Sequence, residues 1–174
     1  MNDASATVPG RECGTCLMCC KLPSVPELQK PANKWCQHAK PGTGCSIYEA
    51  RPGQCRAFYC GWMQDATLGP EWKPETAKFM MFIASDNSLT LMVDPGAPAS
   101  WKDPKYYPTI KTAAARLIET GVPTMVIIGS RRIVVLPQGD VEVKIPEGFG
   151  ARIVTTHGPM GQTHEVEVSA LPAA

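Results

Sequence analysis

The chain lacks the features of a membrane-spanning or secreted protein. No stretch approaches the roughly 18 consecutive apolar residues that indicate a transmembrane helix. Residues 1–10 contain neither a basic nor an apolar segment, so we expect no secretory signal peptide. The formal net charge is only +1, which gives no general reason to bind nucleic acid or an anionic membrane. We therefore expect a cytoplasmic protein whose partners include neither.

The usual signatures of catalysis are also missing. From residue 75 onward the sequence has no nucleotide-binding glycine motif, no G-x-S-x-G and no H-E-x-x-H. His157 and His164 have no carboxylate or nucleophile at a meaningful spacing, so we expect neither to be functional. Whether the protein is an enzyme stays open on these grounds.

Cysteine is absent after position 60, yet the preceding segment holds all eight cysteines of the chain. In a reducing compartment stable disulfides are uncommon, and a dense cysteine pattern indicates metal binding or catalysis. The confinement of the thiols to one segment predicts a site there. The candidate residues of this site are Cys13, Cys16, Cys19, Cys20, Cys36, Cys45, Cys55 and Cys60, which could fill two clusters or one cluster with spare structural cysteines.

The spacing of the first four cysteines, C-x2-C-x2-C-C, carries further information. Thiols three residues apart can converge if the backbone turns tightly, and Gly14 permits such a turn. Cys19 and Cys20 are adjacent, so their side chains diverge, and they are expected to serve two centres or two edges of one cluster. His38 follows Cys36 by two residues and is a further candidate, as a ligand or as a hydrogen-bond donor to a sulfur.

Three interpretations of the thiols are open. Iron–sulfur clusters usually take four cysteines each, although the ferredoxin run C-x2-C-x2-C-x3-C-P is broken here because Pro23 stands at its fourth cysteine. Zinc is held by cysteine tetrads, but no second C-x2-C pair follows the first at the spacing of a zinc ribbon. Disulfides or redox-active thiols are disfavoured by a cytoplasmic setting. All-sulfur sites suit iron and zinc alike, so the expected cofactor is an iron–sulfur cluster or Zn²⁺, with iron slightly favoured.

The residues around the thiols fit a metal site. Residues 11–62 contain seven Lys or Arg and three acids, a surplus of +4, and nearby cations stabilise thiolates. Phe58, Tyr59 and Trp62 could supply an apolar shell that excludes water. The same residues would also serve as ordinary surface charges and core aromatics.

The cysteine segment resembles the YkgJ-type cysteine-cluster family, described as a zinc- or iron-chelating domain and named for its CxxCxxCC signature. The resemblance covers residues 11–62 and includes Trp35-Cys36-x-His38 and the run from Gly44 to Phe58. It implies that the eight cysteines are the metal ligands and that Tyr48, Arg51 and Pro52 support them. A related cluster in flagellin lysine N-methylases is associated with an iron–sulfur centre, but the rest of that enzyme has no counterpart here.

Three functions are compatible with these observations. The first is a metal-binding protein whose cluster holds iron–sulfur and serves redox chemistry or electron transfer. The second is a non-enzymatic zinc-binding module that stabilises a loop-rich segment or mediates an interaction. The third is an enzyme that modifies a protein or peptide through this site, which would make that protein or peptide a partner.

The pattern of short elements predicts an α+β fold in which a cysteine module packs on a small, mainly antiparallel sheet with one main helix. We expect a flexible tail at 1–12, the cysteine module at 13–62 and an α+β region at 63–174. Within the module, Ser46 and Glu49 match a capping box and Pro52 begins a second turn. Asp103 is the expected N-cap of a helix at about 104–120, regular from 109 and followed by Gly121. Strands are expected at about 77–84, 89–93, 124–128, 132–136 and 141–145, with weaker candidates at 151–155 and 165–168.

Overall fold

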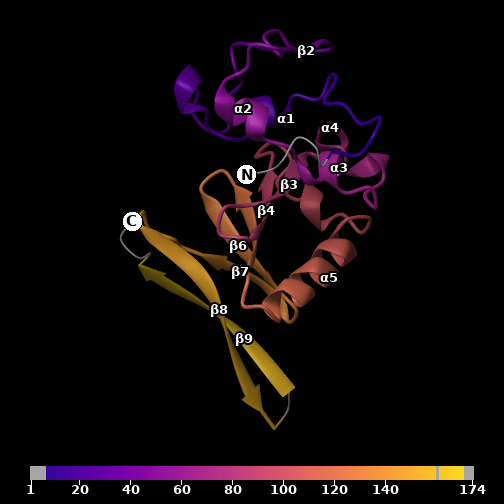
Figure 1. Cartoon of the computed structure of the whole chain (residues 1–174). Helices are drawn as coiled ribbons and strands as arrows, with labels where there is room; N and C mark the ends of the chain where they lie inside the picture. The colour runs from indigo at the N-terminus through magenta and orange to yellow at the C-terminus, as the bar shows by residue number, and fades with distance from the viewer. Residues whose placement is uncertain (1–6, 160, 171–174) are drawn as a thin grey trace. The chain divides into compact units, whose positions relative to one another are not determined.

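The computed structural model describes residues 7–159 and 161–170. The chain divides into two compact units. Unit 1 comprises Met1–Phe82 and Met92–Trp101, and unit 2 comprises Ile83–Leu91 and Lys102–Ala174. Helices and strands are both present (Figure 1), so the expected α+β class is confirmed.

Unit 1 consists of short elements joined by loops. Along residues 7–82 no described helix or strand is longer than five residues. These elements are α1 (Met18–Lys21), η2 (Pro26–Leu28), β1 (Ala39–Lys40), β2 (Gly44–Cys45), α2 (Gly53–Ala57), α3 (Gly61–Gln64), η3 (Pro70–Trp72), α4 (Pro74–Ala77) and β3 (Phe79–Ile83), whose last residue belongs to unit 2.

Part of the expected flexible tail is held in place. The Val8 amide donates a hydrogen bond to the carbonyl of Met63 at 2.7 Å. The Arg11 guanidinium donates to the carbonyls of Trp62, Asp65 and Leu68. Residues 7–12 are therefore anchored to the segment that follows the last cysteine, while the rest of the expected tail, 1–6, lies outside the described residues.

Unit 2 contains the longer elements. They are α5 (Tyr107–Ile118), β5 (Thr124–Ile128), β6 (Arg131–Leu136), β7 (Gly139–Val143), β8 (Phe149–Gly158) and β9 (Gly161–Ala170). An apolar core forms where Ile118 of α5 packs with Val134 and Leu136 of β6 and with Ile153 of β8. Burial of these side chains stabilises the unit without help from a ligand.

The larger sheet has the strand order β3-β4-β5-β6-β7, with β4 at Leu89–Val93. The β5–β6 and β6–β7 pairs are antiparallel. Ile128 pairs with Arg131, so Gly129 and Ser130 form the expected two-residue hairpin loop. β8 and β9 form a separate antiparallel ribbon.

The main helix begins later than expected. Asp103 caps the turn that precedes α5 rather than α5 itself: its Oδ1 accepts the Lys105 amide at 3.0 Å, and its carbonyl accepts the Tyr106 and Tyr107 amides. The N-cap residue of α5 is Tyr106. Pro108 instead stands in the first turn of the helix, where its missing N–H costs nothing. Gly121, at φ +74°, ends the helix as expected.

Two strands have other bounds than the sequence predicted. The prediction of 77–84 was wrong at its start, since Ala77 ends α4 and Lys78 adopts φ +62° before β3 begins. The prediction of 141–145 was two residues late, because Leu136 pairs directly with Gly139 across a two-residue loop. The candidates at 151–155 and 165–168 lie within the longer β8 and β9. The strands expected at 89–93 and 124–128 are confirmed, and the one at 132–136 begins one residue earlier.

None of the helices in the described part of the chain combines the length and the apolar character needed to cross a bilayer.

Candidate metal centre

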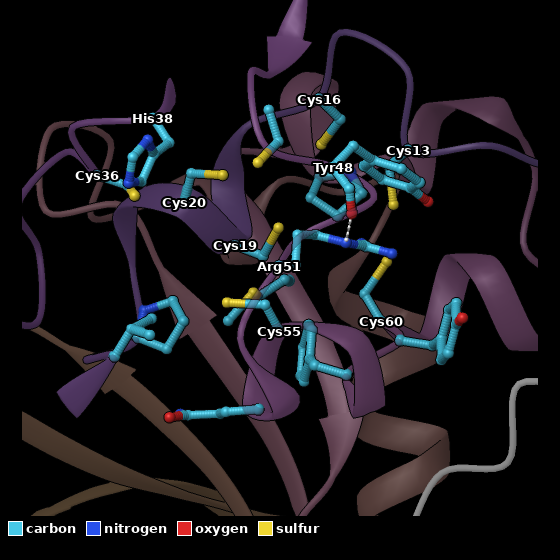
Figure 2. A pocket seen from close by; sticks show the side chains of 18 of the residues that line it. Cys13, Cys16, Cys19, Cys20, Cys36, His38, Tyr48, Arg51, Cys55 and Cys60 are labelled. Atoms are coloured by element: carbon cyan, nitrogen blue, oxygen red, sulfur yellow. Dashed lines mark hydrogen bonds between the residues drawn. The ribbon is translucent and has the colours of Figure 1, made fainter. Parts of the chain in front are cut away.

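All eight cysteines line a single cavity of about 120 Å³ within unit 1. Figure 2 labels seven of them and shows their side chains gathered about the cavity. All eight thiols are free of disulfides. Three separate parts of the segment, containing four, two and two cysteines, therefore come together as the sequence predicted.

The first four cysteines lie on a tight turn followed by α1. Gly14 has φ +51°, a value that favours glycine, and the Cys16 amide donates to the Cys13 carbonyl at 2.9 Å. Cys19 and Cys20 occupy α1. Their side chains form a hydrogen bond with each other, so the two thiols lie close together and the expected divergence is not seen.

The middle pair is held against the first segment by backbone contacts. The Cys36 amide donates to the Cys20 carbonyl at 2.9 Å. The β1–β2 ladder then pairs Ala39 with Cys45. At Gly44, which precedes Cys45, a Cβ atom would lie 2.5 Å from the carbonyl oxygen of Gly14. Only glycine allows the two loops to approach so closely.

The expected capping box is not formed. The Ser46 hydroxyl donates to the His38 carbonyl at 3.2 Å, and residues 46–50 are turns and a bend rather than a helix. The predicted helix does not form here, because the Ser46 side chain binds the segment that follows Cys36 instead of capping a helix.

The last two cysteines lie on α2 and at the start of α3. Pro52 precedes α2, as expected, and Cys55 lies within it. Cys60 is the N-cap residue of α3 and packs, with Cys16 and Cys19, against a buried apolar cluster. The cluster consists of Met18, Leu22 and Met80. The cysteine cavity thus has an apolar wall.

The pKa is raised for five of the eight thiols. Burial raises the pKa of Cys60 to about 11. Burial also raises the pKa of three further thiols, those of Cys13, Cys16 and Cys55. The pKa of Cys19 is raised by its hydrogen bond with Cys20 and by burial. Thiolates in this cavity therefore need compensating positive charge, which a bound metal would supply.

Lys30 is the most buried charged group at the site. Its side chain lines the cavity and the residue is only 6% exposed. The ammonium donates to the carbonyls of Lys21 at 3.0 Å and Pro31 at 3.1 Å, and also to that of Pro23. Burial lowers the pKa of Lys30, and the neighbouring cysteines oppose this shift. Lys30 thus fixes the connector between Cys20 and Cys36 and places positive charge beside the thiols.

Arg51 and Tyr48 form a second charged element. The Arg51 guanidinium lies 3.6 Å from the centre of the Tyr48 ring, and its Nε donates to the Tyr48 carbonyl at 2.7 Å (Figure 2). The positive charge of Arg51 opposes the rise in the pKa values of Cys13 and Cys55. It is therefore placed to stabilise thiolates from different parts of the segment.

The kinds of side chain around the cavity suit a metal ion, but their arrangement does not form a coordination site. Within residues 7–159 and 161–170, no three Cys, His, Asp or Glu side chains converge closely enough to hold an ion. The sulfurs line the cavity, and coordination would require rotation of their side chains. Eight thiols in an apolar cavity with nearby cations suit soft metals such as iron in clusters or zinc.

The three histidines lie in different units. His38 lines the cavity and stays a candidate ligand. His157 and His164 belong to the β8–β9 ribbon of unit 2, where their rings bond Gln162 and Thr155. Neither is among the residues that line the cavity.

Sequence reasoning counted Lys30 only as one of seven cations and missed its buried position. The available signal was the connector itself, in which Pro23, Pro26 and Pro31 leave several carbonyls without helical or strand partners. A lysine within such a connector can satisfy those carbonyls. Sequence reasoning also did not predict the contact between Arg11 and Trp62, in which the guanidinium carbon lies 4.9 Å from the centre of the Trp62 ring.

Comparison with known proteins gives no match to a family model, to a curated protein or to a solved structure. The assignment of a function therefore depends on the chemistry of the cysteine cavity.

Proposed function

We propose that the cysteine segment is a metal-binding centre in which the eight thiols hold iron–sulfur, and that the protein serves redox chemistry or electron transfer. The observation that carries this proposal is the convergence of all eight cysteines on one cavity. Thiols placed for packing alone would have no reason to come together from three parts of the chain.

The size and lining of the cavity favour a cluster over a single ion. One water molecule needs about 10–15 Å³ of such space, whereas this cavity offers about 120 Å³. Eight thiols also exceed the four that one zinc ion takes. The apolar wall formed by Met18, Leu22 and Met80 would shield the site from water.

The chain's own groups have definable roles at such a site. The cysteines provide thiolates, and Lys30 and Arg51 offset part of their negative charge. A bound iron–sulfur centre would supply reversible electron transfer at a potential set by charge, hydrogen bonding and exposure. We also propose that the chain is a member of the YkgJ-type family, on the strength of its CxxCxxCC signature and the residues that follow it.

A second candidate is a structural zinc site. It is favoured by the short elements of unit 1, none of which exceeds five residues along 7–82. Segments with so little regular structure often fold only when a metal links them. In that case the metal would stabilise the module, and the function would be non-enzymatic.

The test is metal and acid-labile sulfide analysis of protein purified without oxygen, with its visible spectrum before and after dithionite. The proposal expects iron, sulfide and a visible absorption that bleaches on reduction. Colourless protein with stoichiometric zinc would establish the structural candidate instead. Protein that binds neither metal would contradict both.

A further inference from the structure

One buried hydrogen-bond donor at the cysteine cavity has no acceptor. Among the residues that the structure describes, four buried side-chain nitrogen or oxygen atoms have no hydrogen-bond partner: Trp62 Nε1, Ser100 Oγ, Thr124 Oγ1 and Asp140 Oδ1. Of these four residues, only Trp62 lines the cavity. A buried N–H group without a partner is unfavourable and rare in folded proteins. The position of the Trp62 indole beside the thiols therefore needs a physical reason.

The Trp62 ring is held in place by two cations. Trp62 lies in α3, whose N-cap residue is Cys60. The Arg11 guanidinium donates to the Trp62 carbonyl, and its carbon lies 4.9 Å from the centre of the ring. The Lys73 ammonium lies 5.5 Å from the same centre. Because cations are attracted to the face of an aromatic ring, these contacts restrict rotation of the indole and of its N–H group.

The wall that holds the indole is fastened to the turn between the first two cysteines of the chain. Lys73 lines the cavity beside Trp62 and forms an ion pair with Glu75 at 2.7 Å. The other carboxylate oxygen of Glu75 accepts a hydrogen bond from the hydroxyl of Thr15, at 3.2 Å. Thr15 belongs to that turn. The donor is thus built into the same framework as the thiols.

The lining of the cavity indicates which acceptor the donor would meet. Eight cysteine side chains line the cavity, and within the described part of the chain no Asp or Glu does. A thiol sulfur is a weak acceptor, so the thiols leave the indole unpaired. Metal binding requires thiolates, and hydrogen bonds to ionised acceptors are roughly twice as strong as those between neutral groups. Metal loading would therefore supply the acceptor that Trp62 lacks.

We propose that the Trp62 indole N–H donates a hydrogen bond to a metal-bound sulfur of the cysteine centre and raises the reduction potential of that centre. This inference rests on the proposed function and adds to it a residue that adjusts the centre without being a ligand. Hydrogen bonds to the sulfurs help to set the potential of an iron–sulfur centre. Reduction adds negative charge, so a donor stabilises the reduced form more than the oxidised form.

Nuclear magnetic resonance of protein loaded with ¹¹³Cd²⁺ tests the hydrogen bond directly. A proton that is bonded to a metal-bound sulfur shows a scalar coupling to the cadmium nucleus, and a change in folding alone does not produce this coupling. The chain has four tryptophans, and each indole N–H signal is assigned with the corresponding Trp→Phe variant. We expect coupling to cadmium at Trp62, and none at Trp72 or Trp101, which are buried but do not line the cavity. Bound cadmium without coupling at any of the four indole signals would overturn the inference.

The reduction potential gives an independent readout in iron-loaded protein. Trp62→Phe keeps an aromatic ring for Arg11 and removes the donor, so its midpoint potential should be lower than that of the wild type. The equilibrium constant for reduction should fall roughly threefold to tenfold, the ratio that corresponds to one hydrogen bond. Trp72→Phe is the matched control, because it is the same substitution at a buried tryptophan outside the cavity lining. An unchanged potential in Trp62→Phe, or an equal fall in Trp72→Phe, would overturn the inference.

Failure of the proposed function and failure of this inference give different results. Wild-type protein that binds neither cadmium nor iron would contradict the proposed function and the inference with it. Wild-type protein that binds both metals but shows no coupling at Trp62 would overturn the inference and leave the proposed function standing.

Discussion

The two units use different means to reach an ordered structure. Unit 2 has a helix of twelve residues, two ten-residue strands and a core of aliphatic side chains. Unit 1 has short elements and places eight thiols, Lys30 and Arg51 around a cavity beside a buried apolar cluster of its own. Apolar burial stabilises both units, and the proposed metal would stabilise unit 1 further by joining its thiols.

The largest expected effect follows from metal removal. Structural zinc contributes on the order of 10–16 kcal/mol in small cysteine-rich domains, so stripping metal from this protein should unfold much of the cysteine segment. Amide hydrogen exchange should become fast at 13–62 and stay slow in β5, β6 and β7. Equal loss of protection in both units, or no loss in either, would remove the contrast between them.

The converse experiment damages unit 2 and spares unit 1. Leu136 is 1% exposed and packs in the unit 2 core, so Leu136→Ala should lower the free energy of unfolding by about 3 kcal/mol. Chemical denaturation of the metal-loaded protein measures this loss. The matched control is Val141→Ala on β7, because Val141 is 41% exposed.

Metal content should not change in either variant. If Leu136→Ala also lost its metal, the stability of unit 1 would depend on the core of unit 2, and the two units could not be treated as independent.

A smaller effect is expected from the buried lysine. Lys30→Met leaves three backbone carbonyls without their shared donor, which should cost roughly 2 kcal/mol and increase the alkylation rate of Cys36 in metal-loaded protein. Lys34→Met is the control, since Lys34 is exposed four residues further on. If both variants behaved alike, Lys30 would not hold the connector.

The smallest effect concerns a polar cluster in unit 2. Tyr107 donates to Asp140 at 3.0 Å; burial, followed by this hydrogen bond and the Asp140 charge, raises the pKa of Tyr107 to about 12. Because the folded-state pKa lies above the unfolded value of about 10, the resulting stability is present below pH 10 and is lost as the pH rises through 12.

Asp140→Asn should move the titration of Tyr107 toward ordinary tyrosine, while burial keeps it somewhat raised. Ultraviolet titration of tyrosinate, with Tyr107→Phe to assign the signal, measures the change. A titration unaffected by Asp140→Asn would show that burial alone sets this pKa.

Sequence patterns predicted most of unit 2 because its signals are local. Alternating and β-branched runs located β4, β5 and β6, and Gly129 with Ser130 identified a hairpin. The predicted starts of a helix and a strand were wrong where a nearby residue changed the backbone conformation. Pro108 set the first turn of α5, and Lys78 ended α4 in a left-handed conformation.

The sequence predicted which cysteines lie at the site, but it did not predict how the segments that carry them contact one another. Spacing alone indicated that eight thiols act together, and Gly14 indicated the turn between the first two. The backbone bond between Cys20 and Cys36 and the burial of Lys30 depend on contacts between distant segments. The approach of Gly44 to Gly14 has no local signature either, because it is set by the packing of two loops.

The central claim is that unit 1 is a metal centre built from its cysteines. Comparison of the mass of freshly purified protein under native and denaturing conditions, both without oxygen, tests it most directly. The account predicts that the native mass exceeds the denatured mass by that of bound metal, with sulfide if the centre is iron–sulfur. Identical masses, with all eight thiols open to alkylation in the native protein, would contradict it.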